Sequence, residues 1–250
     1  VAVSGGVDSM CLADLFLRNY GPDSFAVAHC NFHLRGDESD GDEVLVRDWA
    51  EENGIHCHLT SFDTEQYAVK ESVSIEMAAR ELRYQWFAEV AAEEGCKAIA
   101  VAHHQHDQAE TVLLNLKRGT GIRGLCGMRA KSSNPYGLDE GIPIIRPLLC
   151  TTRDYIEHYL RDIRHLSWVE DSTNATEEYT RNKIRHSVIP LLKEINPALC
   201  DSVYKNTEHL RGVNELYRLL LEEKIKNITE PTQRGIRIDV EALKTLDGEA

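Results

Sequence analysis

The sequence predicts an α/β fold, in which a parallel five-stranded sheet with helices on both faces is followed by a smaller all-helical domain. Short β-type apolar runs alternate with segments of helical periodicity through the first two thirds of the chain. A glycine-rich turn follows the first apolar run and directly precedes a helical segment. After about Thr151 the strand signals fade and helical periodicity takes over.

The alternation is seen in the order of the expected elements. We expect strands near residues 1–3, 25–29, 56–60, 98–102 and 142–145. Between them we expect helices over residues 9–19, 39–52, 75–94 and 105–118, each ended by glycine or a polar break. Parallel strands joined by helices in this way indicate a Rossmann-like layer arrangement.

The last third is expected to be helical over residues 155–161, 177–192 and 199–226, and a weak Gly-Ile-Arg-Ile-Asp strand comes near the end. Asn174 and Glu177 have the spacing of a capping box at the start of the second helix. We expect one domain over residues 1–185 and a helical linker or substrate domain over 186–250. Because residue 1 already lies in an apolar run, we expect the natural protein to continue beyond both ends.

Composition excludes several classes of protein. With 42% apolar and 28% charged residues, the chain is not collagen-like or largely disordered. No window of 18 apolar residues and no basic leader followed by an apolar run occurs, so we expect no membrane partner and a cytoplasmic location. Seven cysteines without CxxC spacing are expected to be reduced.

The net charge of the whole chain is −13, which by itself disfavours nucleic acid as a partner. The charge is, however, unevenly distributed along the chain. Basic residues outnumber acidic residues between residues 117 and 185, by 12 to 9. This middle region can therefore form a phosphate-facing surface in an acidic protein.

The strongest functional motif is SGGVDS at residues 4–9. Two glycines allow a tight turn, and the free N–H groups at the following helix start attract an anion. Ser4 and Ser9 can donate to phosphate oxygens, and Asp8 can bind Mg²⁺ or cap the helix. No Walker lysine follows, which excludes a GTPase-type loop. The alternative is a plain strand-to-helix turn.

Two further segments follow expected strands at the edge where open α/β sheets bind ligands. The first is HCNFHLRG (residues 29–36), whose alternative role is a polar cap on the sheet edge. The second is HHQHDQAET (residues 103–111), in which Asp107, Glu110 and Thr111 share one face of a first helical turn. Acidic residues also suit a helix N-terminus electrostatically. A structural zinc site is disfavoured, because three histidines within four positions cannot all face one ion.

The loop at residues 4–9 resembles the pyrophosphate loop of the N-type ATP pyrophosphatases, the PP-loop family. Together, the three segments resemble the tRNA(Ile)-lysidine synthases within that family. The resemblance continues in KRGTG (117–121), IRPLL (145–149) and YTRNKIR (179–185), and in single positions, namely Glu76, Ala79, Arg80, Arg83, Tyr84, Gly124, Leu125, Trp168, Asp171 and Asn174. One departure is His106, which stands where the family usually has an acidic residue.

This resemblance implies a carbon–nitrogen ligase that uses ATP and Mg²⁺ to join free lysine to the wobble cytidine of the CAU-anticodon isoleucine tRNA. ATP would adenylate the cytosine 2-oxygen, and the lysine ε-amine would then displace AMP. It also implies a C-terminal tRNA-binding region that these 250 residues do not contain. The oligomeric state stays open, a homodimer included.

The resemblance carries over to individual residues. Catalytic roles fall to Asp8, Asp107 and Glu110, of which Asp8 and Asp107 are the candidate Mg²⁺ ligands. Either Asp107 or Glu110 can bind or deprotonate the lysine amine. The ATP-binding candidates are Ser4, Gly5, Gly6, Val7, Asp8, Ser9, His29 and Asn31. The candidates for contacts with tRNA or substrate are His33, Arg35, Arg80, Arg83, His104, Thr111, Arg118, Gly119, Arg181, Asn182 and Arg185.

Two other classes of function remain possible on the sequence. Another PP-loop enzyme, such as a tRNA thiolation enzyme, would need a sulfur donor, and the chain has no CxxC. A module that only binds the nucleotide would show no turnover. For Arg181 and Arg185, a solvated charged helix face is the alternative to RNA binding.

Overall fold

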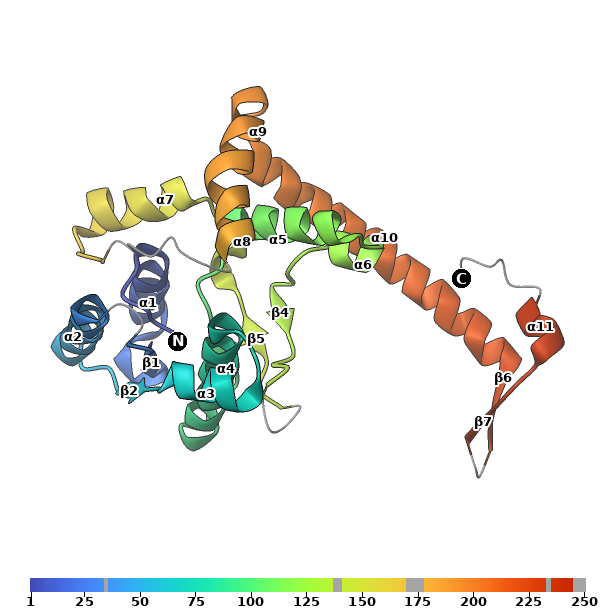
Figure 1. Ribbon diagram of the computed structural model, residues 1–250, viewed down its shortest axis with the longest axis horizontal. Helices are drawn as coiled ribbons and strands as arrows, with labels where there is room; N and C mark the ends of the chain where they lie inside the picture. The colour runs from blue at the N-terminus through green and yellow to red at the C-terminus, as the bar shows by residue number, and fades with distance from the viewer. Residues whose placement is uncertain (34–35, 137–140, 170–177, 233–234, 245–250) are drawn as a thin grey trace.

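The computed structural model describes residues 1–33, 36–136, 141–169, 178–232 and 235–244 (Figure 1). Arg35, Asp171, Asn174 and Glu177 lie outside these ranges, and so does the expected capping box. The helices are α1 (Val7–Tyr20), α2 (Asp37–Glu52), α3 (Thr64–Glu71), α4 (Ile75–Glu93), α5 (Gln105–Arg118), α6 (Ile122–Leu125), α7 (Arg153–His158), α8 (Glu178–Lys183), α9 (Ile189–Ile195), α10 (Leu199–Ile228) and α11 (Val240–Lys244). The strands are β1 (Val27–Asn31), β2 (Cys57–Ser61), β3 (Ile99–Ala100), β4 (Lys131–Ser132), β5 (Ile144–Ile145), β6 (Thr229–Thr232) and β7 (Gly235–Ile238). Short turns of helix complete the chain: η1 (Pro22–Ser24), η2 (Pro147–Cys150), η3 (Tyr159–Arg164) and η4 (Ile184–Val188).

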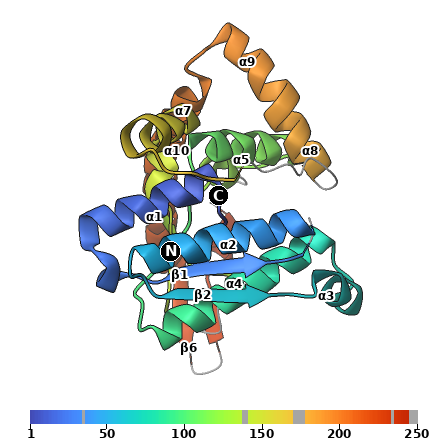
Figure 2. The same cartoon turned by 90° about the vertical axis from the view of Figure 1, so that its left-hand side faces the viewer.

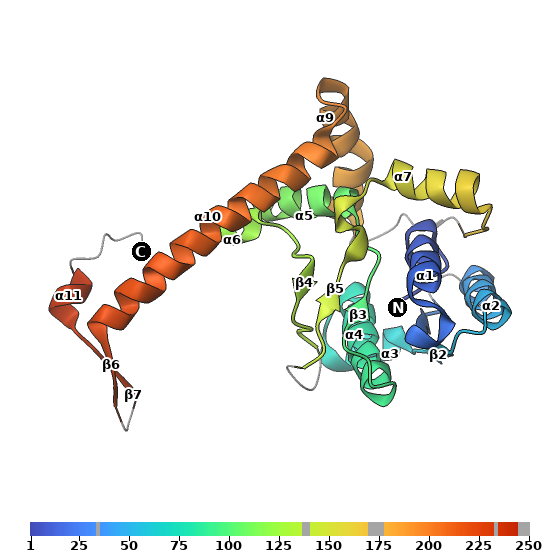
Figure 3. The same ribbon diagram turned by 180° about the vertical axis from the view of Figure 1, so that it is seen from behind.

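The α/β class is confirmed, but the expectation of one five-stranded parallel sheet is wrong. In the described residues β1 and β2 form a parallel pair, and a separate three-stranded sheet has the order β3-β5-β4 with β4 antiparallel (Figure 3). Residues 1–3 lie between the two sheets without forming a strand. Val3 N donates to Ala28 O on one side, and Ala2 N donates to Ala100 O on the other. Residues 1–3 therefore do not join the two sheets into one ladder, because their pairing with β1 amounts to an isolated bridge between Ala2 and Ala28.

Helices cover both faces of this layer, as expected. Adjacent residues of β1 point to opposite sides, since side chains alternate along a strand. Val27 belongs to the core formed with α1 and α2, whereas Ala28 belongs to the core formed with α4, β3 and β5. Accordingly, α2 and α4 lie on opposite sides of β1 and β2 (Figure 2). This arrangement places the ends of the parallel strands, where the motifs lie, along one edge.

The expected helices of the first two thirds are confirmed at α1, α2, α4 and α5, but α3 was not expected. Helix α3 has only eight residues, so its sequence pattern is short. The Asp63 side chain caps its start by accepting a hydrogen bond from Gln66 N, and Ser72 ends it in the left-handed region at φ 56°. Among the described residues, no helix combines the length and apolar character that crossing a membrane requires.

In the last third, the long helix α10 ends at Ile228, and two short strands and the five-residue helix α11 follow it. The long helix α10 runs away from the α/β layer, and β6, β7 and α11 lie at its far end (Figure 1). β6 and β7 form an antiparallel hairpin, so the expectation of an all-helical domain is wrong. The second strand, β7, is the Gly-Ile-Arg-Ile segment that was expected as a weak strand. β-branched Thr229, Thr232 and Ile236 favour extended backbone, and Gly235 takes φ 145°, which suits glycine.

The start of α10 is fastened to α5 by a buried amide. Gln108 is fully buried, and its Nε2 donates to Thr207 Oγ1 at 3.0 Å while its Oε1 accepts from Met128 N at 2.8 Å. A separate apolar cluster forms beside it from Ala109, Ile184, Ile189 and Cys200. The helical elements are therefore attached through α5, the helix that carries the acidic motif.

Helix α1 is held from the other side by α7 and η3. Leu160 and Ile156 are 0% and 1% exposed in the core that also contains α1. The buried Asp14 of α1 accepts from Tyr159 Oη at 2.6 Å and from Arg164 Nε at 2.9 Å. These contacts fix the helix whose N-terminus follows the glycine loop.

Replacing Leu160 with alanine is expected to lower the free energy of unfolding by about 2 to 5 kcal/mol, because the side chain is fully buried and leaves a cavity. The measurement is urea unfolding followed by circular dichroism. Ile163→Ala is the matched control, since Ile163 belongs to the same η3 segment but is 55% exposed. Equal losses for the two variants would contradict this packing.

Candidate active site

The SGGVDS motif forms the turn into α1. Gly5 takes φ 91°, a left-handed conformation that favours glycine, and no side chain caps the helix at Gly6. Ser9 Oγ donates to Gly6 O at 2.9 Å and accepts from Ser4 N at 3.1 Å. Because the first N–H groups of a helix have no partner within the helix, this uncapped N-terminus can bind an anion.

Two predicted carboxylates meet at one imidazole beside this loop. His104 Nε2 lies 3.5 Å from Asp8 Oδ1 and 3.5 Å from Asp107 Oδ2. His104 Nδ1 accepts a hydrogen bond from His106 N, and Asp107 Oδ2 accepts one from His104 N at 3.0 Å. His104 and Asp107 thus form a capping box at the start of α5. Asp107 therefore caps α5, as the electrostatic alternative expects, and its carboxylate also lies beside the imidazole that contacts Asp8.

The electrostatics of this pair favour an ionised Asp107. Burial alone would raise the pKa of Asp107, but the nearby His104 and His103, the His104 N–H and Arg181 outweigh it and lower the pKa. For His104, burial has the opposite effect and lowers the pKa. Contact with Asp8 and the charges of Asp107 and Asp8 outweigh burial, so the pKa of His104 is raised above its ordinary value of 6.5. The two groups therefore hold opposite charges more readily than they would in water.

The other two histidines of the motif are held neutral. Burial lowers the pKa of His103 to about 4, and burial together with Lys193 lowers the pKa of His106 to about 4. Lys193 Nζ lies 2.8 Å from His106 Nε2, so the neutral ring accepts a hydrogen bond from the ammonium group. The three histidines of the motif thus have different partners and different charge preferences.

Glu110 is fully buried, and two arginines bind it, one from α8 and one from η4. Arg181 Nε donates to Glu110 Oε2 at 2.8 Å, and Arg185 Nε donates to Glu110 Oε1 at 2.5 Å. Arg185 also reaches Asp107 Oδ1 at 3.3 Å. These arginines, expected to face RNA or solvent, are instead partly engaged with the acidic face of α5.

Arg153 is a site residue that the sequence reasoning missed. Its NH1 group donates to Asp8 Oδ2 at 2.7 Å, and its Nε donates to Glu157 at 2.8 Å. Arg153 is the first residue of α7 and lies far from Asp8 in the sequence. The only sequence signal nearby is the pair Thr151 and Thr152, which indicates the start of a helix but not a contact with Asp8. Asp8 Oδ1, by contrast, is buried with no hydrogen-bond partner in the described structure.

Residues at the end of β1 have different roles. His29 Nδ1 lies 2.9 Å from Val3 O, directly before the glycine loop, and burial lowers the pKa of this imidazole. Its Nε2 is buried without a hydrogen bond in the described residues. Asn31 Nδ2 instead donates to Asp40 and Glu43, and its Oδ1 accepts from His33 N, which fixes the chain that follows.

The remaining predicted contacts lie at separate places. Arg83 stacks over the Phe32 ring and Arg80 over the Tyr84 ring, each with 5.0 Å to the centroid. Arg118 and Gly119 end α5, about 16 Å along the helix axis from Asp107. Thr111 Oγ1 donates to Asp107 O, and Asn182 lies in α8 beside Arg181. The structure thus brings Asp8 of the glycine loop together with His104, Asp107, Glu110, Arg181 and Arg185. Thr111 contacts Asp107 within α5, whereas Arg118 and Gly119 lie at the far end of that helix.

A glycine loop before an uncapped helix, with carboxylates gathered at the ends of parallel strands, is the arrangement typical of α/β domains that bind a nucleotide phosphate. Residues 1–192 match the PP-loop domain family. The chain therefore belongs to the PP-loop family, whose members use ATP.

Curated relatives carry one functional description. The chain is 48% identical over 239 residues to the tRNA(Ile)-lysidine synthase of Bacteroides thetaiotaomicron, covering 96% of this chain and 53% of that protein. It is 44% identical over 222 residues to the tRNA(Ile)-lysidine synthase of Chlorobaculum tepidum, covering 88% of this chain and 64% of the relative. The chain thus spans about half the length of curated relatives that it matches.

A solved structure confirms the fold class. The U34-tRNA thiolase NcsA from Methanococcus maripaludis, solved with its [4Fe-4S] cluster, superposes with a TM-score of 0.66. The match covers 84% of this chain and 70% of that one at 21% identity. At this identity the similarity concerns the fold alone.

Glu110→Gln is expected to lower the free energy of unfolding by about 2 kcal/mol, because a buried acceptor of charged hydrogen bonds is lost and two guanidinium groups lose their shared partner. Chemical unfolding of the two proteins measures the difference. Glu215→Gln serves as the control, since Glu215 pairs with Arg218 on an exposed part of α10. An unchanged unfolding midpoint for Glu110→Gln would show that the buried network is not formed.

Proposed function

We propose that this chain carries the ATP-dependent chemistry of a tRNA(Ile)-lysidine synthase, a ligase that joins lysine to C2 of the wobble cytidine in the CAU-anticodon isoleucine tRNA. The observation that carries the proposal is the position of His104 Nε2, within 3.5 Å of both Asp8 and Asp107. His104 thus connects the glycine loop, through Asp8, with Asp107 of helix α5. The names of the curated relatives support the same substrate.

The first half-reaction uses the glycine loop. The cytosine 2-oxygen attacks the α-phosphorus of ATP, an O–P bond forms, and the bond to the β-phosphate breaks to release pyrophosphate. The uncapped N-terminus of α1 stabilises the departing pyrophosphate through its N–H groups and its dipole. The hydroxyl of Ser4, which is exposed, lies at the mouth of this turn.

The residues present fit a magnesium ion. Carboxylate oxygens suit this cation, and Asp8 Oδ1 is buried without a hydrogen-bond partner in the described structure. Asp8 and Asp107 would hold the ion, which supplies charge neutralisation for the pyrophosphate. Asp8 is also held in place by Arg153 at 2.7 Å.

The second half-reaction needs a neutral lysine amine. The ε-amine attacks C2 of the adenylated cytidine, a C–N bond forms, and the C–O bond breaks to release AMP and a proton. Asp107 is the better candidate to bind this amine, since its side chain is 13% exposed and ionised. Both oxygens of Glu110 are already taken by Arg181 and Arg185, so Glu110 acts by positioning those arginines.

The tRNA requires a basic surface and an unstacked base. An anticodon loop supplies an accessible cytidine, which a pocket can take without opening a duplex. Arg118 is the exposed candidate for a phosphate contact, at the far end of α5. Arg181 and Arg185 are about one third to one half exposed, so they can contact RNA while holding Glu110.

Sulfur transfer is the second candidate, favoured only by the fold of the thiolase neighbour. Three cysteines of the α/β part do not suit it. Burial raises the pKa of the Cys11 and Cys30 thiols to about 12 and that of Cys57 to about 11. Such thiols stay protonated at neutral pH and are poor nucleophiles and metal ligands.

The test follows radiolabelled lysine into CAU-anticodon tRNA in the presence of ATP and Mg²⁺ while AMP is quantified. We expect lysine incorporation with matching AMP release. Asp8→Asn and Asp107→Asn should each lower the rate by about 100-fold or more, because each removes a charge that faces the reacting phosphates. Asp48→Asn is the control, since Asp48 is exposed on α2 and pairs with its neighbour Arg47.

The two products separate the possible outcomes. AMP release without lysine uptake would overturn the lysidine reading and direct attention to other acceptors. Equal rates for Asp8→Asn, Asp107→Asn and Asp48→Asn would remove the two carboxylates from the reaction.

A further inference from the structure

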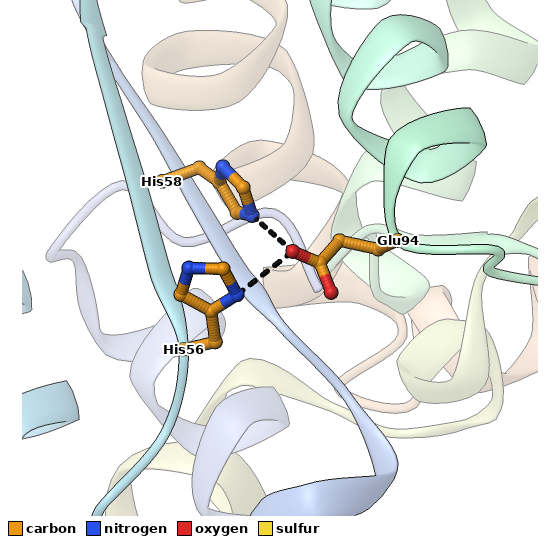
Figure 4. Close-up of side chains that lie close together, drawn as sticks. All are labelled: His56, His58 and Glu94. Carbon is orange, nitrogen blue, oxygen red and sulfur yellow. Dashed lines mark hydrogen bonds and ion pairs between the residues drawn. The ribbon is translucent and has the colours of Figure 1, made fainter.

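A second cluster of ligand-type side chains lies apart from the glycine loop. His56 directly precedes β2, His58 lies within it, and Glu94 caps the C-terminal end of α4. His56 Nδ1 and His58 Nε2 are each 2.7 Å from the same oxygen, Glu94 Oε1 (Figure 4). Two residues apart on extended backbone, the histidines project from the same side, and their ring centroids are 4.4 Å apart.

We propose that His56, His58 and Glu94 bind one divalent transition-metal ion, with Zn²⁺ as its natural occupant. Two imidazole nitrogens and one carboxylate oxygen form a three-ligand set known from zinc sites, with the remaining position open to water. Imidazole ligands favour zinc and its neighbours over Mg²⁺ and Ca²⁺, which prefer oxygen. This cluster is therefore chemically distinct from the Asp8 and Asp107 pair.

The side chains need only small rotations to hold an ion. The three ligand atoms lie within 4.8 Å of one another. In a tetrahedral site with metal–ligand distances of about 2.1 Å, neighbouring ligand atoms are about 3.4 Å apart. The two nitrogens already converge on one point, which Glu94 Oε1 reaches from the opposite side (Figure 4). A short retreat of the carboxylate makes room for the ion.

The helix end provides an independent reason for a cation. Helix C-termini carry partial negative charge and normally favour basic side chains. The last turn of α4 has no basic residue, and Glu93 and Glu94 add two further negative charges there. A bound divalent cation compensates this charge. The His56 side chain is 66% exposed, so the ion can enter from solvent.

The location separates this site from the proposed reaction. The glycine loop follows residues 1–3 at the carboxyl edge of the parallel layer, whereas His56 and His58 lie at the amino end of β2. Among the described strands, β2 pairs only with β1 and is therefore an outer strand. A bound ion would fasten this outer strand to α4, a structural role that does not depend on ATP or tRNA.

The alternative is that the two histidines simply contact Glu94 without an ion. Metal titration of the full 250-residue chain distinguishes the two. Co²⁺ is the optical probe, because its visible absorption reports tetrahedral coordination, and Zn²⁺ is then added to displace it. Native mass spectrometry counts the ions bound per chain.

We expect one Co²⁺ ion per chain, displaced by Zn²⁺, and binding weakened about tenfold or more in His58→Ala and in Glu94→Gln, since each removes one of three ligands. His158→Ala is the matched control. His158 Nδ1 lies 2.6 Å from Asp162 Oδ2, which is also a histidine–carboxylate pair but lacks a third ligand. This control should bind Co²⁺ as the unaltered chain does.

Three results would overturn the proposal. One is the absence of Co²⁺ binding by the unaltered, folded chain. Another is undiminished binding in both His58→Ala and Glu94→Gln. The third is an absorption band of a cobalt–thiolate bond, which would place the ion on cysteine. Circular dichroism of each variant confirms that the fold is retained.

Discussion

The candidate active site depends on one buried imidazole held between carboxylates from two different helices. Asp8 belongs to α1 and Asp107 to α5, and His104 Nε2 lies 3.5 Å from a carboxylate oxygen of each. The imidazole is oriented from its other side, since His104 Nδ1 accepts a hydrogen bond from His106 N. A neutral side chain in place of His104 would remove the one group that both carboxylates share, leaving Asp8 with Arg153 and Asp107 with Arg185. The glycine loop, the acidic helix and the charge balance between them thus depend on a single contact.

A second charged network extends this site into the helical part of the chain. Glu110 is fully buried, and Arg181 and Arg185 bring the segment of α8 and η4 against α5. Breaking a buried pair by removing one partner is costly, whereas both partners together contribute little net stability. Such a network therefore serves better to select one packing arrangement than to add stability. Gln108 has a similar role on the adjacent face of α5, where it contacts Thr207 of α10.

Local patterns predicted most helices, because capping residues and periodicity act over a few neighbouring residues. The motifs at residues 4–9 and 103–111 were also correctly placed, since loops that follow parallel strands meet at one edge. Sequence separation explains what was missed. Arg153 reaches Asp8 from another element, and the role of Arg185 as a partner of Glu110 depends on how α8 packs. The cluster of His56, His58 and Glu94 joins a strand to a helix end, which no spacing rule reveals. The extent of one continuous sheet was overestimated because residues 1–3 make only an isolated bridge to Ala28 and a hydrogen bond to Ala100, while the short strands β4 and β6 were not expected.

The most direct test of the central contact is the pKa of His104, measured by NMR of its imidazole nitrogens across a pH titration. The structure predicts a pKa above the ordinary value of 6.5, because contact with Asp8 and the charge of Asp107 outweigh burial. A raised pKa stabilises the folded state fully below pH 6.5, and this contribution is lost as the pH rises through the higher value. In Asp8→Asn the pKa should fall, since burial then meets less opposition. A His104 pKa at or below 6.5 in the unaltered chain would contradict the proposed arrangement.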